Sequence, residues 1–155
     1  RDMLELQALG ERLTTLNDDQ LVGLDLPDDL RGAVAEARRI TRHEARRRHM
    51  QYIGRLMRSV DPGPIRNKLR QWEGQSLEAT ATLHRVERIR DELLADDAAL
   101  ARFVADHPRA DTQRLRALIR GVRDDRAAGK PARHFRDLFR ELKRAVDERD
   151  QADTD

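Results

Sequence analysis

Apolar residues recur along this chain at the three- and four-residue spacing of amphipathic helices. No segment shows the period-two alternation that a half-buried strand requires. The apolar spacing and the turn-forming residues predict a short helical turn through Leu21 and Leu24, and longer helices over residues 4–16, 28–60, 65–72, 76–95, 98–106, 111–129 and from 131 onward. We therefore predict an all-α fold.

The longest predicted helix begins after Pro27 and meets no helix breaker before Asp61–Pro62–Gly63–Pro64. With a rise of 1.5 Å per residue, its roughly 30 residues would extend about 45 Å. The apolar stripe of its first half is offset by about 130° from the stripe of its second half, and residues 41–49 between them include a single apolar residue, Ala45. We interpret this pattern as an elongated dumbbell, in which two small helical bundles are joined through a long helix with an exposed basic shaft.

This interpretation divides the chain into three parts. Residues 1–45 would form a first bundle, to which part of the later chain could also contribute, and residues 46–146 a second bundle. Residues 147–155, DERDQADTD, set five acids against Arg149 alone, and we expect this acidic tail to be disordered.

The arginines are concentrated in one part of the sequence. Residues 31–60 carry nine arginines against Glu36 and Glu44, a local charge of +7 in a chain whose net charge is +2. Three of the 31 basic residues are lysine. Arginine suits phosphate recognition, because its planar guanidinium donates paired hydrogen bonds and stacks on bases. An arginine-biased genome would explain the ratio of arginine to lysine equally well, but it would not explain the clustering.

Other classes of protein find little support in the composition. The absence of Cys excludes disulfides and thiolate chemistry, and the five histidines, His43 and His49 included, lack the spacing of a zinc motif. No nucleophile or phosphate-loop motif is present, so we expect no enzymatic activity, no metal and no cofactor. No apolar run approaches the roughly 20 residues of a membrane span and no signal peptide is visible, so we expect a cytoplasmic protein. The chain begins at Arg1 rather than at Met, and we expect an N-terminal piece to precede it.

The combination of helices, a local charge of +7 and 3% aromatic residues suits a partner with dense phosphate charge. Folded RNA fits better than a single strand, because single-strand binders normally stack bases on several aromatic side chains. A DNA-binding helical protein is one alternative, although no helix-turn-helix is visible. A helical protein–protein adaptor, whose charges serve solvation, is the other.

The segment RHMQYIGRLMR, residues 48–58, resembles the R-Q-x-Q-[YF]-I-G-K-L-M-R signature of the YjgA-like, or DarP, family of bacterial ribosome-associated proteins. The likeness continues in LQALGERL (6–13), LPDDLRGAVAEARRI (26–40), HRVERIRDELL (84–94), HPRADTQRLRALIR (107–120) and LFRELK (138–143). His49 and Arg55 stand where the family usually has Gln and Lys, His107 where it has Tyr, and Ile89 where Trp is common.

The resemblance implies an all-helical dumbbell without catalytic activity. It also implies association with the large ribosomal subunit and its precursors, and assistance in late maturation near the peptidyl-transferase centre.

Charge and resemblance together lead to a hypothesis: a monomeric, non-enzymatic assembly factor that binds rRNA of the large-subunit precursor, with ribosomal proteins as further candidate partners and no membrane. In order of priority, the predicted RNA-binding residues are Arg38, Arg39, Arg42, Arg46, Arg47 and Arg48, then Arg55 and Arg58, then Arg116 and Arg120. Tyr52, Ile53, Leu56 and Met57 are predicted to pack in a core. Gly54 is predicted to allow the close approach of either a second helix or RNA.

Overall fold

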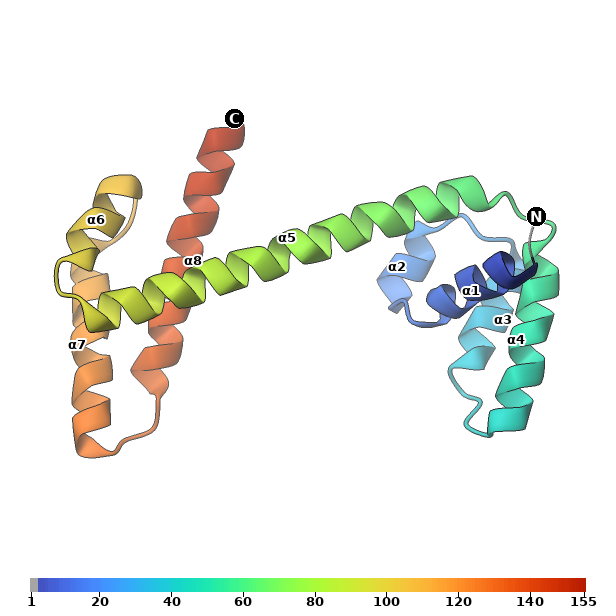
Figure 1. The fold of residues 1–155 in the computed structure, drawn as a ribbon, viewed down its shortest axis with the longest axis horizontal. Coiled ribbons are helices and arrows are strands. Elements are labelled where there is room, and N and C mark those ends of the chain that lie inside the picture. Colours follow the sequence, from blue (N-terminus) through green and yellow to red (C-terminus); the bar gives the residue numbers. More distant parts are fainter. Residues whose placement is uncertain (1–2) are drawn as a thin grey trace. The chain divides into compact units, whose positions relative to one another are not determined.

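The computed structural model describes residues 3–155, and all regular secondary structure in them is helical (Figure 1). The helices are α1 (Met3–Thr14), α2 (Asp18–Gly23), α3 (Asp28–Ala37), α4 (His43–Met57), α5 (Pro62–Ala95), α6 (Ala99–Asp106), α7 (Thr112–Ala128) and α8 (Arg133–Thr154). The predicted all-α class is confirmed.

The chain divides into two compact units. Unit 1 extends to Gly74 and unit 2 begins at Gln75, so the division falls within α5. It differs from the predicted boundary after residue 45, because both halves of the supposed long helix at 28–60 lie in unit 1.

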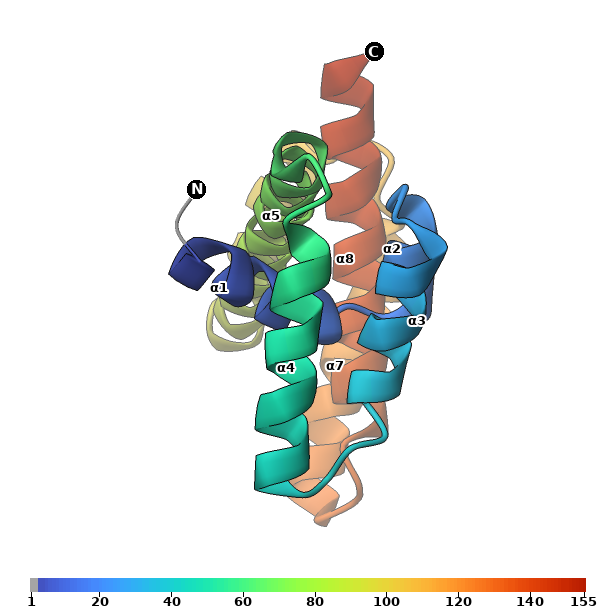
Figure 2. The same ribbon diagram turned by 90° about the vertical axis from the view of Figure 1, so that its right-hand side faces the viewer.

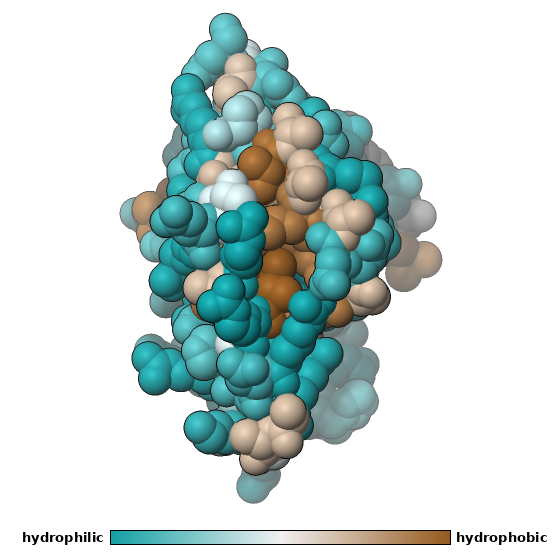
Figure 3. All heavy atoms as spheres, turned by 90° about the vertical axis from the view of Figure 1, so that its left-hand side faces the viewer, coloured by the Kyte–Doolittle hydropathy of each residue, from teal (hydrophilic) through white to brown (hydrophobic). Residues whose placement is uncertain are grey.

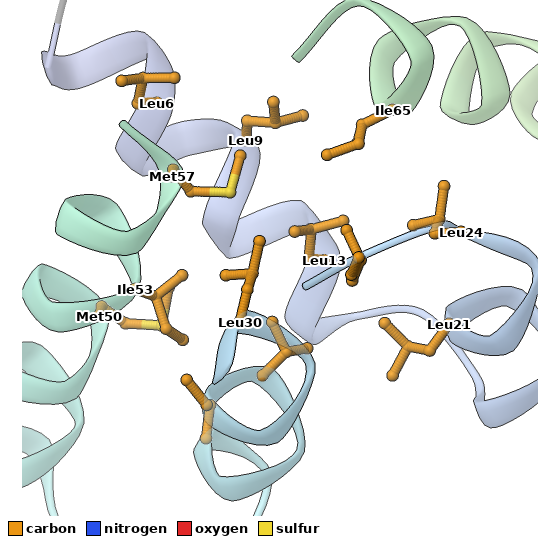
Figure 4. Close-up of a cluster of buried hydrophobic side chains, with 14 of the residues drawn as sticks. Leu6, Leu9, Leu13, Leu21, Leu24, Leu30, Met50, Ile53, Met57 and Ile65 are labelled. Carbon is orange, nitrogen blue, oxygen red and sulfur yellow. The ribbon is translucent and has the colours of Figure 1, made fainter. Parts of the chain in front are cut away.

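The core of unit 1 is aliphatic and lies among α1, α3 and α4 (Figure 2). Figure 4 shows Leu13, Leu30, Ile53 and Met57 pointing toward one another from these three helices, and all four side chains are fully buried. Side chains from α2 and from the start of α5, such as Ile65, extend the same cluster. Burying a leucine or isoleucine contributes roughly 1.5–3 kcal/mol, so these four side chains supply much of the stability of unit 1.

The expectation of one continuous helix over residues 28–60 is wrong. The chain leaves the helix after Ala37, forms a connection over residues 38–42 and begins α4 at His43. Helices α3 and α4 then lie side by side (Figure 2). The two apolar stripes, offset on a single helix, therefore face one core once the chain folds back, and no exposed shaft exists between them.

Contacts from α4 stabilise the place where α3 ends. The Arg46 guanidinium donates a hydrogen bond of 3.0 Å to the carbonyl of Ala37, the last residue of α3. The Nε2 of His49 lies 2.6 Å from the carbonyl oxygen of Ala33, one turn earlier. Ala37 carries one of the last four carbonyls of α3, which lack partners within the helix, and the Arg46 cation beside it is favourable. The consecutive β-branched residues Ile40 and Thr41 also lower the helix propensity of the connection.

The long helix of this chain is α5, in a segment where the sequence predicted two shorter helices at 65–72 and 76–95. Its start is well defined, because the Asp61 carboxylate accepts a hydrogen bond of 3.0 Å from the Gly63 amide and Pro62 occupies the first helical turn. Gly74 was expected to end a helix, but the helix continues through it. A helical glycine costs about 1 kcal/mol relative to alanine, which the good helix formers around it can offset.

Unit 2 is built around the hairpin of α7 and α8 (Figure 1). Leu115, Leu138 and Leu142 are fully buried there, together with Val86 from α5 and, less completely, Phe103 from α6. Gly129 ends α7 with a φ of 66°, and the Lys130 amide donates to the Asp125 carbonyl over 2.9 Å in the manner of a Schellman motif. A left-handed backbone at this position favours glycine.

The expected disorder of residues 147–155 is also wrong, because α8 continues to Thr154. Lys143 pairs with Asp147 over 2.6 Å, and Arg144 pairs with Glu148 over 2.7 Å, each one helical turn apart. Arg85 reaches Asp150 from α5 over 2.7 Å. Three of the five acids in this segment thus have basic partners that lie outside it in the sequence.

The turn end of the α7–α8 hairpin carries a hydrogen-bonded His–Asp pair packed against a glycine. The Nδ1 of His134 lies 2.6 Å from the Asp125 carboxylate. A Cβ placed on Gly121 would lie 2.6 Å from the His134 ring, so glycine leaves the space that the ring occupies. The hydrogen bond from His134, more than the charge interaction, lowers the pKa of Asp125 below its ordinary value.

This lowered pKa predicts an acid-dependent contribution to stability. A carboxyl group whose pKa is lower in the folded state stabilises the fold above its unfolded pKa of about 3.9, and the stabilisation is lost as pH falls toward the folded value. Asp125→Asn should therefore lower the melting temperature at pH 7, and the difference from wild type should shrink below about pH 4. Thermal melts followed by circular dichroism across this range test it. A difference that persists unchanged at pH 3 would show that the charge of Asp125 is not responsible.

Candidate nucleic-acid interface

Eight of the nine arginines of residues 31–60 fall into two groups of four, and the first group contacts other parts of unit 1. Arg38, just after α3, donates to the Asp18 carboxylate over 2.6 Å and to the Leu16 carbonyl, and so ties α3 to the connection between α1 and α2. Arg31 donates to the carbonyls of Leu24 and Leu26. Both guanidinium groups are thus engaged with groups of unit 1, although the buried Nε of Arg31 has no hydrogen-bond partner in residues 3–155.

Arg46 belongs to the same group. Besides the Ala37 carbonyl, its guanidinium reaches the Thr14 hydroxyl at 3.4 Å and the Glu11 carboxylate at 3.6 Å, both on α1. Arg46 therefore connects α1, α3 and α4 at one point of unit 1. Arg58 also contacts α1, with its Nε 3.2 Å from the Met3 sulfur.

The second group consists of Arg39, Arg42, Arg48 and Arg55, which we call the outward arginines. All four side chains are exposed, and none forms an ion pair with any residue from 3 to 155. Arg39 and Arg42 lie in the connection between α3 and α4, whereas Arg48 and Arg55 lie on α4. Arg47, also exposed, pairs with Glu44 over 3.1 Å; such a surface pair is worth at most about 0.5 kcal/mol and exchanges readily for another anion.

The buried and exposed faces of α4 explain where these side chains point. Met50, Ile53 and Met57 are buried, so the residues on the opposite side of the helix, Arg48 and Arg55 among them, face solvent. Arg48 and Arg55 are seven residues apart, which is two helical turns or about 10 Å along the axis. A helix face of this kind presents two planar donors to an elongated anionic partner.

Tyr52 lies on the same exposed face, so the expectation that it packs in a core is wrong. Its side chain is 40% exposed, whereas Ile53 and Met57 are buried and Leu56 packs against the core as predicted. The Arg55 guanidinium lies 5.8 Å from the centre of the Tyr52 ring.

Gly54 was expected to allow close approach of a helix or RNA. No atom of the described residues lies within 4 Å of a Cβ placed on it. The close approach lies instead at Gly10, where a Cβ would be 2.9 Å from the Ile53 Cγ2. This contact brings α1 against α4, and it was missed because nothing in the α1 sequence marks Gly10 as a crossing point.

Arg116 and Arg120 lie in unit 2, exposed on α7, and border an apolar groove that α5, α6 and α7 form together. Leu93, Leu100 and Ile119 line this groove, and Figure 3 shows a strip of apolar atoms bordered by polar side chains on that face. The neighbouring Arg123 pairs with Asp97 over 2.8 Å. Neither Arg116 nor Arg120 has an ion-pair partner within residues 3–155.

Unit 1 contains a second basic group that the sequence did not reveal. Arg12 of α1 and Arg66 and Arg70 of α5 line one surface depression. Their ion pairs are long, 3.9 Å for Arg12 with Glu73 and 3.8 Å for Arg66 with Glu5. The three arginines come from segments more than 50 residues apart, so no charge run in the sequence could have indicated them.

No three His, Asp or Glu side chains between residues 3 and 155 are grouped as ligands for a metal ion. None of the helices in that range combines the length and apolar character that a membrane span needs.

The sequence was next compared with known protein families. A family model described as the dual-action ribosomal maturation protein DarP matches residues 1–143. The chain belongs to the DarP family. The resemblance predicted from RHMQYIGRLMR and its flanking segments is thereby confirmed.

Individual DarP proteins are similar over most of their length. The DarP of Nitrosomonas eutropha is 48% identical over 148 residues, which cover 96% of this chain and 84% of the relative. The DarP of Aromatoleum aromaticum is 50% identical over 143 residues, or 92% and 75% of the two chains. The DarP of Burkholderia ambifaria is 47% identical over 148 residues, or 94% and 74%. All three are named dual-action ribosomal maturation proteins.

Proposed function

We propose that this DarP protein is a non-enzymatic ribosome-maturation factor, which binds rRNA of the large-subunit precursor and assists its late maturation near the peptidyl-transferase centre. The observation that carries the proposal is the set of outward arginines, four exposed guanidinium groups without an ion-pair partner in residues 3–155. Family membership supports the ribosomal partner, because the relatives are named as ribosomal maturation proteins. Ribosomal proteins are further candidate partners, and we expect the factor to act as a cytoplasmic monomer.

The proposed mechanism is positional. The outward arginines contact phosphates where rRNA strands come together, and they hold that junction in one conformation while it matures. Phosphate contacts fix the register and orientation of a nucleic acid without reading its bases. Arg47 adds a further contact by exchanging Glu44 for a phosphate, and Arg116 and Arg120 provide contacts from unit 2. Arg38, Arg46 and Arg58 act mainly by maintaining the fold that presents the others.

Salt dependence distinguishes this proposal from its alternatives. Each phosphate contact releases counterions and steepens the fall of log K with log salt by up to about 0.9, so four contacts lower the affinity about a hundredfold between 50 and 200 mM salt. We expect the full chain to co-sediment with large-subunit particles in sucrose gradients at low salt and to dissociate in this range.

The alternatives give other results in the same experiment. A protein–protein adaptor would remain attached to its partner at high salt, because apolar contacts are not screened. A DNA-binding protein would bind duplex DNA tightly and would be absent from the ribosomal fractions of the gradient. Either result would contradict rRNA binding.

A further inference from the structure

The ring of Tyr52 contacts Arg55 and His49, which both belong to α4 itself. The chain contains one Tyr, one Trp and three Phe, and Tyr52 is the one aromatic side chain with an exposed position. Its hydroxyl forms no hydrogen bond with residues 3–155, and it lies on the face of α4 opposite Met50, Ile53 and Met57. An exposed tyrosine in a helix interior also has lower helix propensity than the arginines beside it. These ring contacts to Arg55 and His49 do not join α4 to another helix.

The groups around Tyr52 form a surface suited to a nucleobase. The Arg55 guanidinium lies 5.8 Å from the ring centre on one side, and the His49 ring lies 6.0 Å away with an interplanar angle of 52°. Arg48 is one turn before Tyr52 and has no ion-pair partner in residues 3–155. The Tyr52 ring thus lies between two guanidinium groups that have no ion-pair partner in residues 3–155, one toward each end of the helix.

We propose that Tyr52 is a stacking platform for a single unpaired base of a folded RNA, and that Arg48 and Arg55 contact the phosphates on its two sides. The inference rests on the proposed function. Sequence-specific RNA recognition commonly targets unpaired bases in loops and bulges, which stack on aromatic or guanidinium planes. The charge of this face matches RNA phosphates rather than a basic or apolar partner.

One platform also fits the composition of the chain. Proteins that bind long single strands stack successive bases on several aromatic side chains. Among the Phe, Trp and Tyr rings of residues 3–155, only that of Tyr52 is exposed, and it can hold one base that leaves a helix at a bulge or junction. The inference thereby specifies which part of a folded rRNA would meet α4.

A bulged RNA hairpin provides the test. The probe is a hairpin with a single-adenosine bulge, and its control is the same hairpin with an abasic nucleotide at the bulge, so that both carry the same phosphates. Stacking of one base is worth 1–3 kcal/mol, so the full chain should bind the adenosine hairpin about five- to 150-fold more tightly than the abasic hairpin. Tyr52→Phe should keep this preference, and Tyr52→Leu should remove it.

Charge contacts give a different signature in the same assay. Arg48→Ala should weaken binding to both hairpins alike and reduce the salt slope by about one, because a phosphate contact does not distinguish them. Circular dichroism melts establish that each variant is folded, as expected for substitutions at exposed positions.

Two outcomes would overturn the inference: equal binding of the two hairpins by the wild type, or an unchanged preference in Tyr52→Leu. Equal binding combined with salt-sensitive attachment to large-subunit particles would leave rRNA binding intact and remove the stacking platform alone. Failure to attach to ribosomal particles, by contrast, would contradict the proposed function itself. If α4 instead binds the acidic surface of a partner protein, the two hairpins should also bind equally, which would count against the stacking platform.

Discussion

Charge reversal of the outward arginines is expected to detach the protein from large-subunit particles without unfolding it. In the variant with Arg39, Arg42, Arg48 and Arg55 all changed to Glu, four attractive phosphate contacts become repulsive. We expect the affinity for large-subunit particles to fall by at least about a hundredfold at 50 mM salt. The slope of log K against log salt concentration should become shallower by up to about four. Filter binding over a salt series and sucrose-gradient co-sedimentation measure these two effects.

The fold should tolerate these changes, because none of the four side chains forms an ion pair within residues 3–155. A surface substitution away from buried contacts usually changes stability by less than about 0.5 kcal/mol. Arg38 and Arg46 are deliberately left out, since their guanidinium groups bond to the Leu16 and Ala37 carbonyls. Removing either one would confuse loss of binding with loss of structure.

A matched control exists in unit 2. Arg88, Arg109, Arg133 and Arg136 are exposed and form no ion pair with residues 3–155, so changing them to Glu alters the net charge by the same amount. We expect this control to retain most of its attachment. Equal losses in the two variants would show that binding depends on total charge, and retained attachment of the first variant would exclude the outward arginines as the interface.

Local patterns were sufficient for the helices that do not depend on distant contacts. The stripes through Leu115 and Val122 and through Leu138 and Val146 predicted α7 and α8, because each helix presents one apolar face to the same core. The signal at Asp111, whose carboxylate accepts from the Arg114 amide, correctly marked the start of α7.

The connection between α3 and α4 could not be predicted in the same way. Residues 38–42 contain no Gly or Pro, so no residue there forbids a helix. Tertiary contacts stabilise the end of α3. Arg46 and His49 of α4 contact the carbonyls of Ala37 and Ala33 in α3, and these contacts form only when the chain folds back. The sequence contained one indication of the break, the offset between the two apolar stripes. That offset is equally compatible with a helical hairpin and with one helix shared by two bundles.

The composition of the candidate interface was predictable, but the role of each arginine was not. A charge count locates nine arginines within thirty residues. It cannot separate Arg38, which bonds to the Leu16 carbonyl and Asp18, from Arg39, which faces solvent. The partners of Arg38 and Arg46 lie 9 to 35 residues away along the chain, where no local pattern connects them.

Gly10→Ala and Gly54→Ala are expected to change stability in opposite directions. Both glycines lie inside helices, so alanine brings each a similar gain in helix propensity, about 1 kcal/mol. The Gly10 Cβ would lie 2.9 Å from Cγ2 of Ile53, a fully buried residue whose β-branched side chain cannot rotate away easily. Overpacking costs about 1–3 kcal/mol, so Gly10→Ala should destabilise unit 1 by up to about 2 kcal/mol. Gly54→Ala should stabilise it by about 0.5–1 kcal/mol, because no described atom lies within 4 Å of the new Cβ.

Trp72 makes the measurement specific to unit 1. It is the single Trp of the chain and packs against the core that contains Ile53, so its fluorescence reports the unfolding of this core in urea. The matched gain in propensity cancels between the two variants, and the difference between their free energies of unfolding isolates the contact of α1 with α4. A difference near zero would mean that the two helices can separate without cost, and that Gly10 is not what sets their approach. Destabilisation by Gly54→Ala would instead place an unaccounted neighbour against α4 at that position.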